Sequence, residues 1–317
     1  MQVKFGVQVP QEGLTYEIIK RYFNEFENLG FYSAFVYDHF HPIWNPEDAP
    51  VLEDWVLLSA LARETDKIRI GTLVNCTSFR YPSLLAKMAA SVDVISGGRL
   101  EFMIGAGWFK AEYEGYGIPF LPPKIRIEQM KEAIQIIKLM WTEHKPCFKG
   151  KYYSLGGALN YPKPMQKPYP RIWVGGGGEK LTLKAIAEVG EGTNFTGTPQ
   201  IFKRKLKILQ SHCEKIGRDY NSIKKSWVGN LVIGLNEAEV NREIRKAKIE
   251  TKKNEVKLED IEDTTLVGTP PQMISKIEEY LKLGVDYFII LLGSRYFDLR
   301  DIEAIKLFST KVITAFK

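Results

Sequence analysis

Strand-like and helix-like segments alternate along the whole chain, and this alternation constrains the fold more than any other feature. Eight runs are predicted to be strands, at residues 3–9, 34–37, 68–74, 100–105, 172–175, 192–195, 226–233 and 287–291. Helical patterns lie between them, at residues 16–29, 54–65, 83–95, 124–141, 180–189, 200–216, 271–283 and 298–316. Neighbouring parallel strands need a helical crossover. Eight such units predict a single α/β domain over residues 1–317, a (β/α)₈ TIM barrel.

Two segments exceed what a minimal barrel needs, one after the fourth strand and one after the seventh. Residues 146–170 contain five prolines, and they predict an irregular insertion with a short hairpin near residues 149–154. Residues 235–269 are dense in charges of alternating sign, which predicts a solvated helix or a mobile insertion. Long insertions on the carboxyl face of a barrel are common places for lids.

The charge and the cysteines indicate a small-molecule ligand and a reducing compartment. The net charge is +6, with both signs spread along the chain, which suits an anionic small ligand better than nucleic acid. Cys76, Cys147 and Cys213 lie far apart and are odd in number, so we expect no disulfide framework. The sequence shows neither a signal-peptide pattern nor an apolar run of about 18 residues. We therefore expect a cytoplasmic protein without membrane or nucleic-acid partners.

Polar, aromatic and basic residues follow the strands at the end where a (β/α)₈ barrel carries its functional groups. They include Asp38, His39, His41 and Trp44 after the second strand, Phe79 and Arg80 after the third, Trp108, Phe109 and Glu112 after the fourth, and residues 175–180 after the fifth. The opposite ends, such as residues 66–67 and 97–99, resemble ordinary surface turns. The candidate site is therefore at the carboxyl rim.

Four consecutive glycines, Gly175, Gly176, Gly177 and Gly178, follow the fifth strand directly, and Glu179 and Lys180 open the helical pattern behind them. Glycines let the backbone approach a ligand closely, and a helix N-terminus favours a phosphate. The alternative is a tight strand-to-helix turn. Because the run lies on the same rim as the histidines and tryptophans, a phosphate-binding loop is the stronger interpretation.

His39 and His41 are two positions apart, so on a strand both side chains would face the same way. Such a pair can bind a divalent metal in barrel hydrolases, but the metal needs further ligands at other strand ends. The other histidines, His144 and His212, do not follow strands. We therefore expect no metal site and keep a metal-dependent hydrolase as a minor alternative. His39 is a better candidate for the hydrogen-bond or proton partner of a bound ring.

The sequence has no Walker A motif and no nucleophile elbow, and a dinucleotide fingerprint beginning at Gly105 fails because Lys110 replaces its third glycine. The rim instead predicts a wide apolar pocket with aromatic walls, formed by Phe40, Trp44, Phe79, Trp108 and Phe109. An aromatic pocket beside a phosphate loop fits a flat phosphorylated cofactor such as a flavin or deazaflavin.

Several longer motifs carry a family resemblance over nearly the whole chain. They are Asp38-His39, residues 71–74 with 79–82, residues 96–100, residues 105–113, and residues 162–168 leading into the glycine run. With these motifs the chain resembles the luciferase-like monooxygenase superfamily, and within it the coenzyme F420-dependent oxidoreductases. The resemblance implies an enzyme that transfers a hydride between F420 and a small organic substrate, and it implies a homodimer. An FMN-dependent monooxygenase and a non-catalytic flavin-binding barrel are the alternatives.

The resemblance also implies where the cofactor lies and which residues act on it. The cofactor-binding residues would be Asp38, His39, Leu73, Val74, Gly105, Gly107, Gly175, Gly176, Gly177, Gly178, Glu179 and Lys180. The third strand would contain a non-prolyl cis peptide near Leu73–Val74 that supports the ring. The catalytic residues would be His39 as a proton partner, Trp108 as a wall that excludes water together with Trp44, and Glu112 as an acid.

The chain departs from the sugar-phosphate dehydrogenases of this group at one position. Those enzymes share Asp38-His39-Phe40 but place a catalytic glutamate where this chain has Trp108. Glu112, about one helical turn later, is a replacement candidate, and its alternative role is a carboxylate favoured by the helix dipole. Arg80 would pair with a carboxylate of the cofactor tail or with a structural acid, and the second pairing is favoured.

Overall fold

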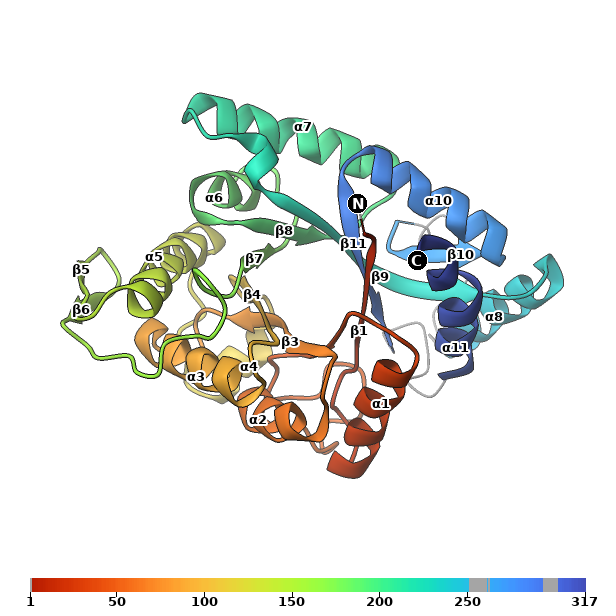
Figure 1. Cartoon of the computed structure of the whole chain (residues 1–317), viewed down its shortest axis with the longest axis horizontal. Coiled ribbons are helices and arrows are strands. Elements are labelled where there is room, and N and C mark those ends of the chain that lie inside the picture. The colour runs from red at the N-terminus through yellow and green to blue at the C-terminus, as the bar shows by residue number, and fades with distance from the viewer. Residues whose placement is uncertain (1, 251–260, 262, 293–301) are drawn as a thin grey trace.

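Eight parallel strands close into a barrel, which confirms the predicted (β/α)₈ fold (Figure 1). The computed structural model describes residues 2–250, 261, 263–292 and 302–317. The barrel strands are β1 (Lys4–Gln8), β2 (Ser33–Val36), β3 (Arg69–Cys76), β4 (Leu100–Gly105), β7 (Ile172–Gly175), β8 (Gly192–Phe195), β9 (Lys224–Ile233) and β11 (Val285–Leu291). Strand β11 lies between β9 and β1, and the pairing of β8 with β9 closes the ring.

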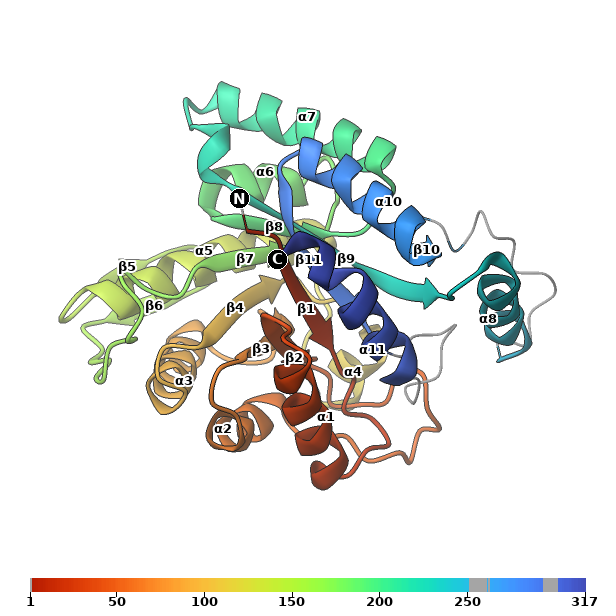
Figure 2. The ribbon, with the colours of Figure 1, turned by 45° about the vertical axis from the view of Figure 1, so that its right-hand side comes forward.

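Helices surround the barrel on its outer side (Figures 1 and 2). They are α1 (Tyr16–Asn28), α2 (Asp54–Glu64), α3 (Pro82–Ile95), α5 (Pro123–Thr142), α6 (Thr182–Val189), α7 (Pro199–Lys215), α10 (Pro270–Lys282) and α11 (Ile302–Lys311), with a 3₁₀ turn at Ile313–Phe316. The start of the helix predicted at 298–316 lies outside the described residues. None of the described helices is long and apolar enough to cross a membrane.

Local sequence signals explain why these helices form where they do. In α1, Thr15 caps the amino end by accepting a hydrogen bond from the backbone N–H of Ile18. The buried residues Ile19, Phe23 and Phe26 recur at helical spacing, so one face of α1 packs on the sheet. Two differences from the prediction are local. Helix α6 begins two residues late because the glycine run and a turn precede it, and the short helix α4 (Lys110–Gly115) was not predicted.

The largest apolar core lies between the helices and the outer face of the barrel, and a smaller one fills the barrel itself. The inner cluster contains Phe35, Leu73, Met103, Trp173, Tyr287 and Ile289. Because successive side chains on a strand point to opposite faces, these inward residues alternate with residues of the outer core. Leu73 also lines the cavity at the carboxyl end, so the inner cluster forms the floor of that cavity.

The insertion at residues 146–170 contains the predicted hairpin, formed by β5 (Cys147–Lys149) and β6 (Ser154–Gly156). Its turn is fixed to α5 because the Glu132 carboxylate accepts hydrogen bonds from the backbone N–H groups of residues 151–153. The insertion starts after α5 and leads into the amino end of β7, and it contributes no residue to the main cavity. The expectation of a lid on the carboxyl face is therefore wrong for this segment.

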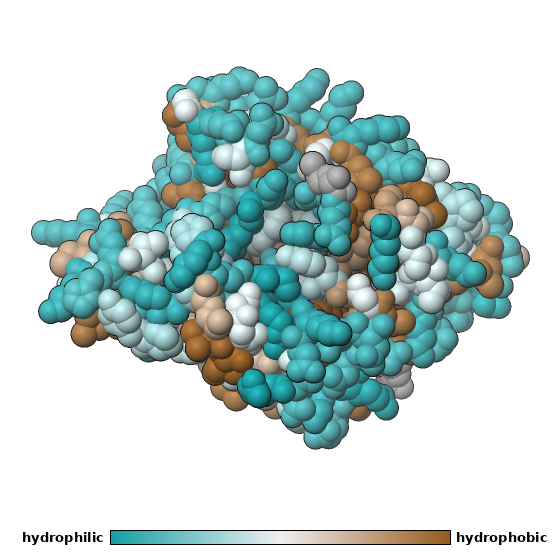
Figure 3. All heavy atoms as spheres, in the orientation of Figure 1, coloured by the Kyte–Doolittle hydropathy of each residue, from teal (hydrophilic) through white to brown (hydrophobic). Residues whose placement is uncertain are grey.

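The second insertion contains α8 (Glu237–Glu250) and an unpredicted strand, β10 (Thr265–Gly268), which is the ninth strand of the main sheet. Strand β10 pairs in parallel with the last four residues of β9, outside the closed ring. Figure 2 shows α8 and the β5–β6 hairpin at opposite sides of the molecule. The face shown in Figure 3 is largely hydrophilic with scattered hydrophobic areas, as expected when the helices bury one side each.

Candidate functional site

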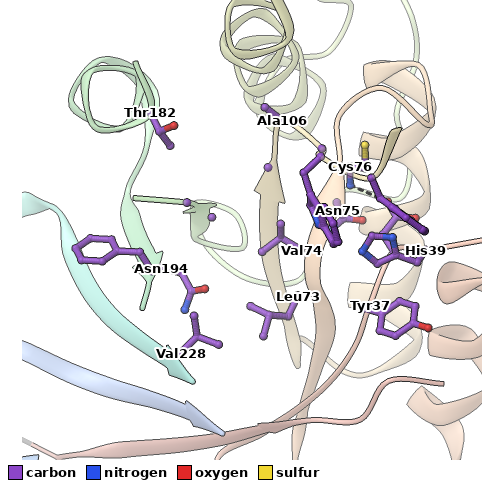
Figure 4. A pocket seen from close by; sticks show the side chains of 18 of the residues that line it. Tyr37, His39, Leu73, Val74, Asn75, Cys76, Ala106, Thr182, Asn194 and Val228 are labelled. Carbon is purple, nitrogen blue, oxygen red and sulfur yellow. Dashed lines mark hydrogen bonds between the residues drawn. The ribbon is translucent and has the colours of Figure 1, made fainter. Parts of the chain in front are cut away.

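A cavity of about 610 Å³ opens among the carboxyl ends of the barrel strands (Figure 4). Most of the predicted site residues line it, namely Asp38, His39, Leu73, Val74, Gly105, Gly107, Trp108, Glu112, Gly175, Gly176 and Gly177, together with Trp44. Gly178, Glu179 and Lys180 do not line it. Figure 4 shows His39 and Tyr37 on one side, Thr182 and Asn194 on the other, and Leu73 and Val74 between them.

His39 is held by a buried carboxylate. Its Nδ1 lies 2.7 Å from Oε2 of Glu112, whose side chain is fully buried. The other oxygen of Glu112 accepts hydrogen bonds from the backbone N–H groups of Phe40 and His41, at 2.6 and 2.9 Å. Since an ionised carboxylate only accepts, Nδ1 of His39 carries the proton and Nε2 is the nitrogen left for a bound molecule. Glu112 therefore orients His39. It also stands in the first turn of α4, where the helix dipole favours a carboxylate, as the alternative role of Glu112 required.

Aromatic rings surround the imidazole of His39. Their centroids lie 4.9 Å away for Tyr37, 5.8 Å for Trp108 and 6.0 Å for Phe109. These contacts give an apolar setting in which a proton partner and a hydrophobic substrate group can lie side by side. Trp108 is more than half exposed, so a bound molecule can cover its ring.

His41 does not share this cavity, so the expectation that the two histidines face the same way is wrong. Strand β2 ends at Val36, and the loop that follows turns His41 toward the ring of Tyr116, with centroids 5.4 Å apart. Within the described residues, no three His, Cys, Asp or Glu side chains gather where they could hold a metal ion. This arrangement removes the support for a hydrolase that would use His39 and His41.

Arg80 pairs with structural acids, as the sequence favoured. Its guanidinium lies 2.8 Å from a carboxylate oxygen of Asp38 and 2.6 Å from one of Asp54, and it also binds Glu53. Burial raises the pKa of Asp38 and of Asp54, an effect that Arg80 opposes. Asp38 also accepts a hydrogen bond from the backbone N–H of Cys76. It therefore fixes the end of β3 against the β2–α2 loop.

The end of β3 contains the predicted cis peptide, which lies in a bulge. The Leu73–Val74 peptide is cis, and the pairing of β3 with β4 shifts register between Thr72 and Asn75. A Cβ on Gly105 would lie 2.8 Å from a methyl carbon of Val74, and one on Gly175 would lie 2.9 Å from the other. Positions 105 and 175 therefore need glycine, because the side chain of Val74 occupies the space that a Cβ would take. The sequence analysis did not include this reason.

The glycine run meets a lysine that the sequence interpretation missed. A Cβ on Gly177 would lie 2.5 Å from the Nζ of Lys205, a residue of α7 that lines the cavity. Burial lowers the pKa of Lys205, and it forms no salt bridge within the described part of the chain. The predicted ligands Glu179 and Lys180 lie outside the cavity: Glu179 pairs with Arg204 at 3.0 Å, and Lys180 is exposed.

Arg126, a second missed cation, lines the same cavity from the first turn of α5. It is 6% exposed and donates to the carbonyl of Gly107 at 2.6 Å, and its guanidinium carbon lies 4.2 Å from the ring centre of Phe120. No described carboxylate pairs with it, and its Nε has no hydrogen-bond partner there. Lys205 and Arg126 both lie in the first two turns of a helix that follows a strand. This position near the rim was the sequence signal that could have identified them as cavity residues.

Comparisons with known proteins agree with this geometry. The model of the luciferase-like monooxygenase family matches residues 2–287. The F420-dependent glucose-6-phosphate dehydrogenase of Segniliparus rotundus is 26% identical over 313 residues, which cover 91% of this chain and 92% of that protein. The FMNH(2)-dependent dimethylsulfone monooxygenase of Pseudomonas putida is 26% identical over 274 residues, 77% of this chain and 74% of that protein.

Two further proteins are similar to the chain, one over about half of its length and one over all of it. An uncharacterized protein of Mycobacterium bovis is 31% identical over 168 residues, and the match spans 53% of this chain and 58% of that protein. The coenzyme F420-dependent tetrahydromethanopterin reductase of Methanopyrus kandleri has the same fold, with a TM-score of 0.81, 21% identity and full coverage of both chains.

Proposed function

Because the chain belongs to the luciferase-like monooxygenase family, we propose that it is an oxidoreductase that transfers a hydride between coenzyme F420 and a small organic substrate. The observation that carries this proposal is Lys205, which lines the cavity beside Gly177 and forms no salt bridge within the described residues; Arg126, a buried cation without a described salt bridge, lines the same cavity beside Gly107. Cations that line a cavity without a salt bridge favour an anionic ligand group there, so the cavity suits one. The phosphate of F420 is such a group.

The residues of the cavity fit a flat phosphorylated cofactor. The side chains of Leu73 and Val74 would support its ring, and residues 175–177, Thr182 and Lys205 would hold its phosphate. When bound, F420 supplies a ring carbon that accepts or donates a hydride, which no protein side chain can do. Gly178, Glu179 and Lys180 would not contact it, because none of them lines the cavity.

His39 would move the proton that accompanies the hydride. In substrate oxidation, Nε2 takes a proton from the substrate as the hydride leaves its carbon, and in reduction it returns that proton. Glu112 keeps the proton on Nδ1, so we assign Glu112 to positioning and not to proton donation. Trp108 and Phe109 would limit water access to the reacting carbon from their place beside the imidazole.

The test is a titration of the purified protein with F420 and, separately, with FMN, followed by absorbance and fluorescence. We expect F420 to bind at least about tenfold more tightly than FMN and to exchange its redox state with an organic substrate. FMN binding tighter than F420, together with oxygen uptake by the reduced complex, would replace this proposal.

An FMN-dependent monooxygenase is the second candidate, and the Pseudomonas putida relative favours it. FMN also carries a phosphate, which residues 175–177, Thr182 and Lys205 would bind in the same way. The two functions differ in the need for oxygen. Substrate turnover under strict anaerobiosis supports the F420 reaction, whereas turnover that stops without oxygen supports the monooxygenase.

We also propose that the protein forms a homodimer through α2 and α3, which contact each other. Large apolar side chains are exposed on this pair of helices, with Val56 73% and Leu84 54% exposed. Burying such side chains against a second copy is favourable. Light scattering after gel filtration should report a dimer, and V56E/L84E should convert it to a monomer. A monomeric wild-type protein would contradict this proposal.

A further inference from the structure

A buried carboxylate, Glu12, lies beside the cavity but takes no part in the chemistry proposed above. Glu12 follows β1 and is fully buried. Its Oε2 lies 2.5 Å from the backbone nitrogen of Ile43, and both of its oxygens lie 3.2 Å from the backbone nitrogen of Trp44. Within the described residues it forms no salt bridge. Its hydrogen bonds to Ile43 and Trp44 all come from main-chain N–H groups of one loop, and its charge also acts on the hydroxyl of Tyr37 at the start of the same loop.

The loop that Glu12 binds has no secondary structure of its own. Residues 37–53 join β2 to α2 without a helix or a strand. The side chain of Gln11 holds both ends of this loop, since it bonds the N–H and C=O groups of Tyr37 and the C=O of Leu52. The N–H of Gly13 bonds to the C=O of Pro50 at 2.8 Å. Glu12 is the residue that holds the middle of the loop.

The side chains carried by the middle of the loop form part of the cavity wall. Ile43 and Trp44 both line the cavity, and Trp44 is 47% exposed. No aromatic ring among the described residues stacks on the Trp44 indole, whereas its backbone N–H is held by Glu12. A carboxylate buried without a cation is costly unless N–H donors compensate it. Glu12 therefore stabilises the fold only when residues 43 and 44 are in this position.

We propose that Glu12 is a positioning residue, which fixes Trp44 and Ile43 as a wall of the substrate end of the cavity. The proposal rests on the proposed function, since that function places the substrate beside His39, which the same loop carries, on the side of the cavity opposite Thr182. Two buried glutamates then each hold a different part of the β2–α2 loop. Glu112 orients the segment with His39, and Glu12 orients the segment with Trp44.

The first experiment needs no substrate. Hydrogen exchange followed by mass spectrometry on the full chain should show amide exchange at residues 43 and 44 rising at least about tenfold in E12Q, because a glutamine offers one acceptor oxygen where the carboxylate offers two. E27Q is the matched control. Glu27 accepts three backbone N–H groups of residues 66–68, far from the cavity, so E27Q should leave exchange at residues 43 and 44 unchanged. Unchanged exchange in E12Q would overturn the proposal.

The second experiment separates positioning from general stability. With F420 and 2-propanol or glucose 6-phosphate as probes, E12Q should raise KM about tenfold and change kcat less than about twofold, with the Kd for F420 unchanged. In a W44A background E12Q should have no further effect on KM, because both changes act on the same wall. Effects of E12Q and W44A that multiply independently would overturn the proposal. Failure of the wild-type protein to bind F420 would sink the proposed function and leave the exchange result standing.

Discussion

The Nδ1 atom of His39 and the Oε2 atom of Glu112 lie 2.7 Å apart, and the same carboxylate bonds the two backbone N–H groups that follow His39. One buried side chain thus fixes both the tautomer of the imidazole and the course of the loop that carries it. This arrangement gives His39 a defined basic atom, Nε2, on the cavity side.

Replacing Glu112 by glutamine should therefore reduce catalysis more than binding. The amide of E112Q can donate to Nδ1, which moves the imidazole proton to Nε2 and removes the base. We expect kcat to fall about 100-fold or more, while the Kd for F420 changes little. E114Q is the control, since Glu114 is exposed and pairs with Lys110 on the same short helix. Equal loss of activity in both variants would contradict the role of Glu112.

The unpaired cations predict a second result. K205M and R126M should each weaken F420 binding about tenfold or more, because a hydrogen bond to a charged group contributes about 1.5–3 kcal/mol. K207M, an exposed change on the same helix as Lys205, serves as the control and should bind normally. Fluorescence titration gives the three dissociation constants. Normal binding by K205M would place the phosphate elsewhere, and normal binding by R126M would exclude a charge contact between Arg126 and F420.

The contact between Val74 and Gly105 predicts a stability effect. In G105A the new methyl group would lie 2.8 Å from a methyl carbon of Val74, so we expect a loss of about 1–3 kcal/mol in the free energy of unfolding. Shortening the partner should relieve the overlap, and V74A/G105A should be more stable than the sum of the two single changes implies. Urea unfolding measures all three variants, and strict additivity would count against this contact.

The cysteines predict a reactivity difference that depends on pH. Burial, with the Asp38 charge as a smaller effect, raises the pKa of Cys76 to about 12, whereas Cys147 is exposed. Iodoacetamide at pH 8 should therefore modify Cys147 and spare Cys76, although Cys76 lines the cavity. Because the folded pKa exceeds the ordinary value of 9.0, the contribution of this thiol to stability is complete below about pH 9 and is lost as the pH rises toward 12. Mass spectrometry of the digested protein gives the labelling, and rapid modification of Cys76 in the folded chain would refute the shift.

The repeating strand–helix pattern was sufficient to predict the barrel, since each unit has its own local signal. Strand β10 was not predicted because it has only four residues and lies in a segment whose many charges predict solvent exposure. The direction of His41 was wrong because the strand period does not continue into the loop after Val36.

The residues at the strand ends were found because a parallel barrel brings those ends together. Lys205 and Arg126 were not, because a helical period shows which face is apolar but not which polar side chain reaches over the rim. The reason why glycine is needed at two strand ends could not be predicted from the sequence either. The sequence shows that Gly105 and Gly175 lack side chains, but only the fold shows that Val74 takes up the space.

Strand β9 belongs to two sheets, and this bears on how the molecule can be altered. Its first residues, through Gly229, pair within the barrel, and residues 230–233 pair only with β10. Closure of the ring therefore does not depend on what lies between the end of β9 and the start of β10. Within that interval α8 contacts β9 and β10 and is the part that can be exchanged, whereas Asp263 must be kept, because its carbonyl accepts a hydrogen bond from Thr196 in the cavity wall.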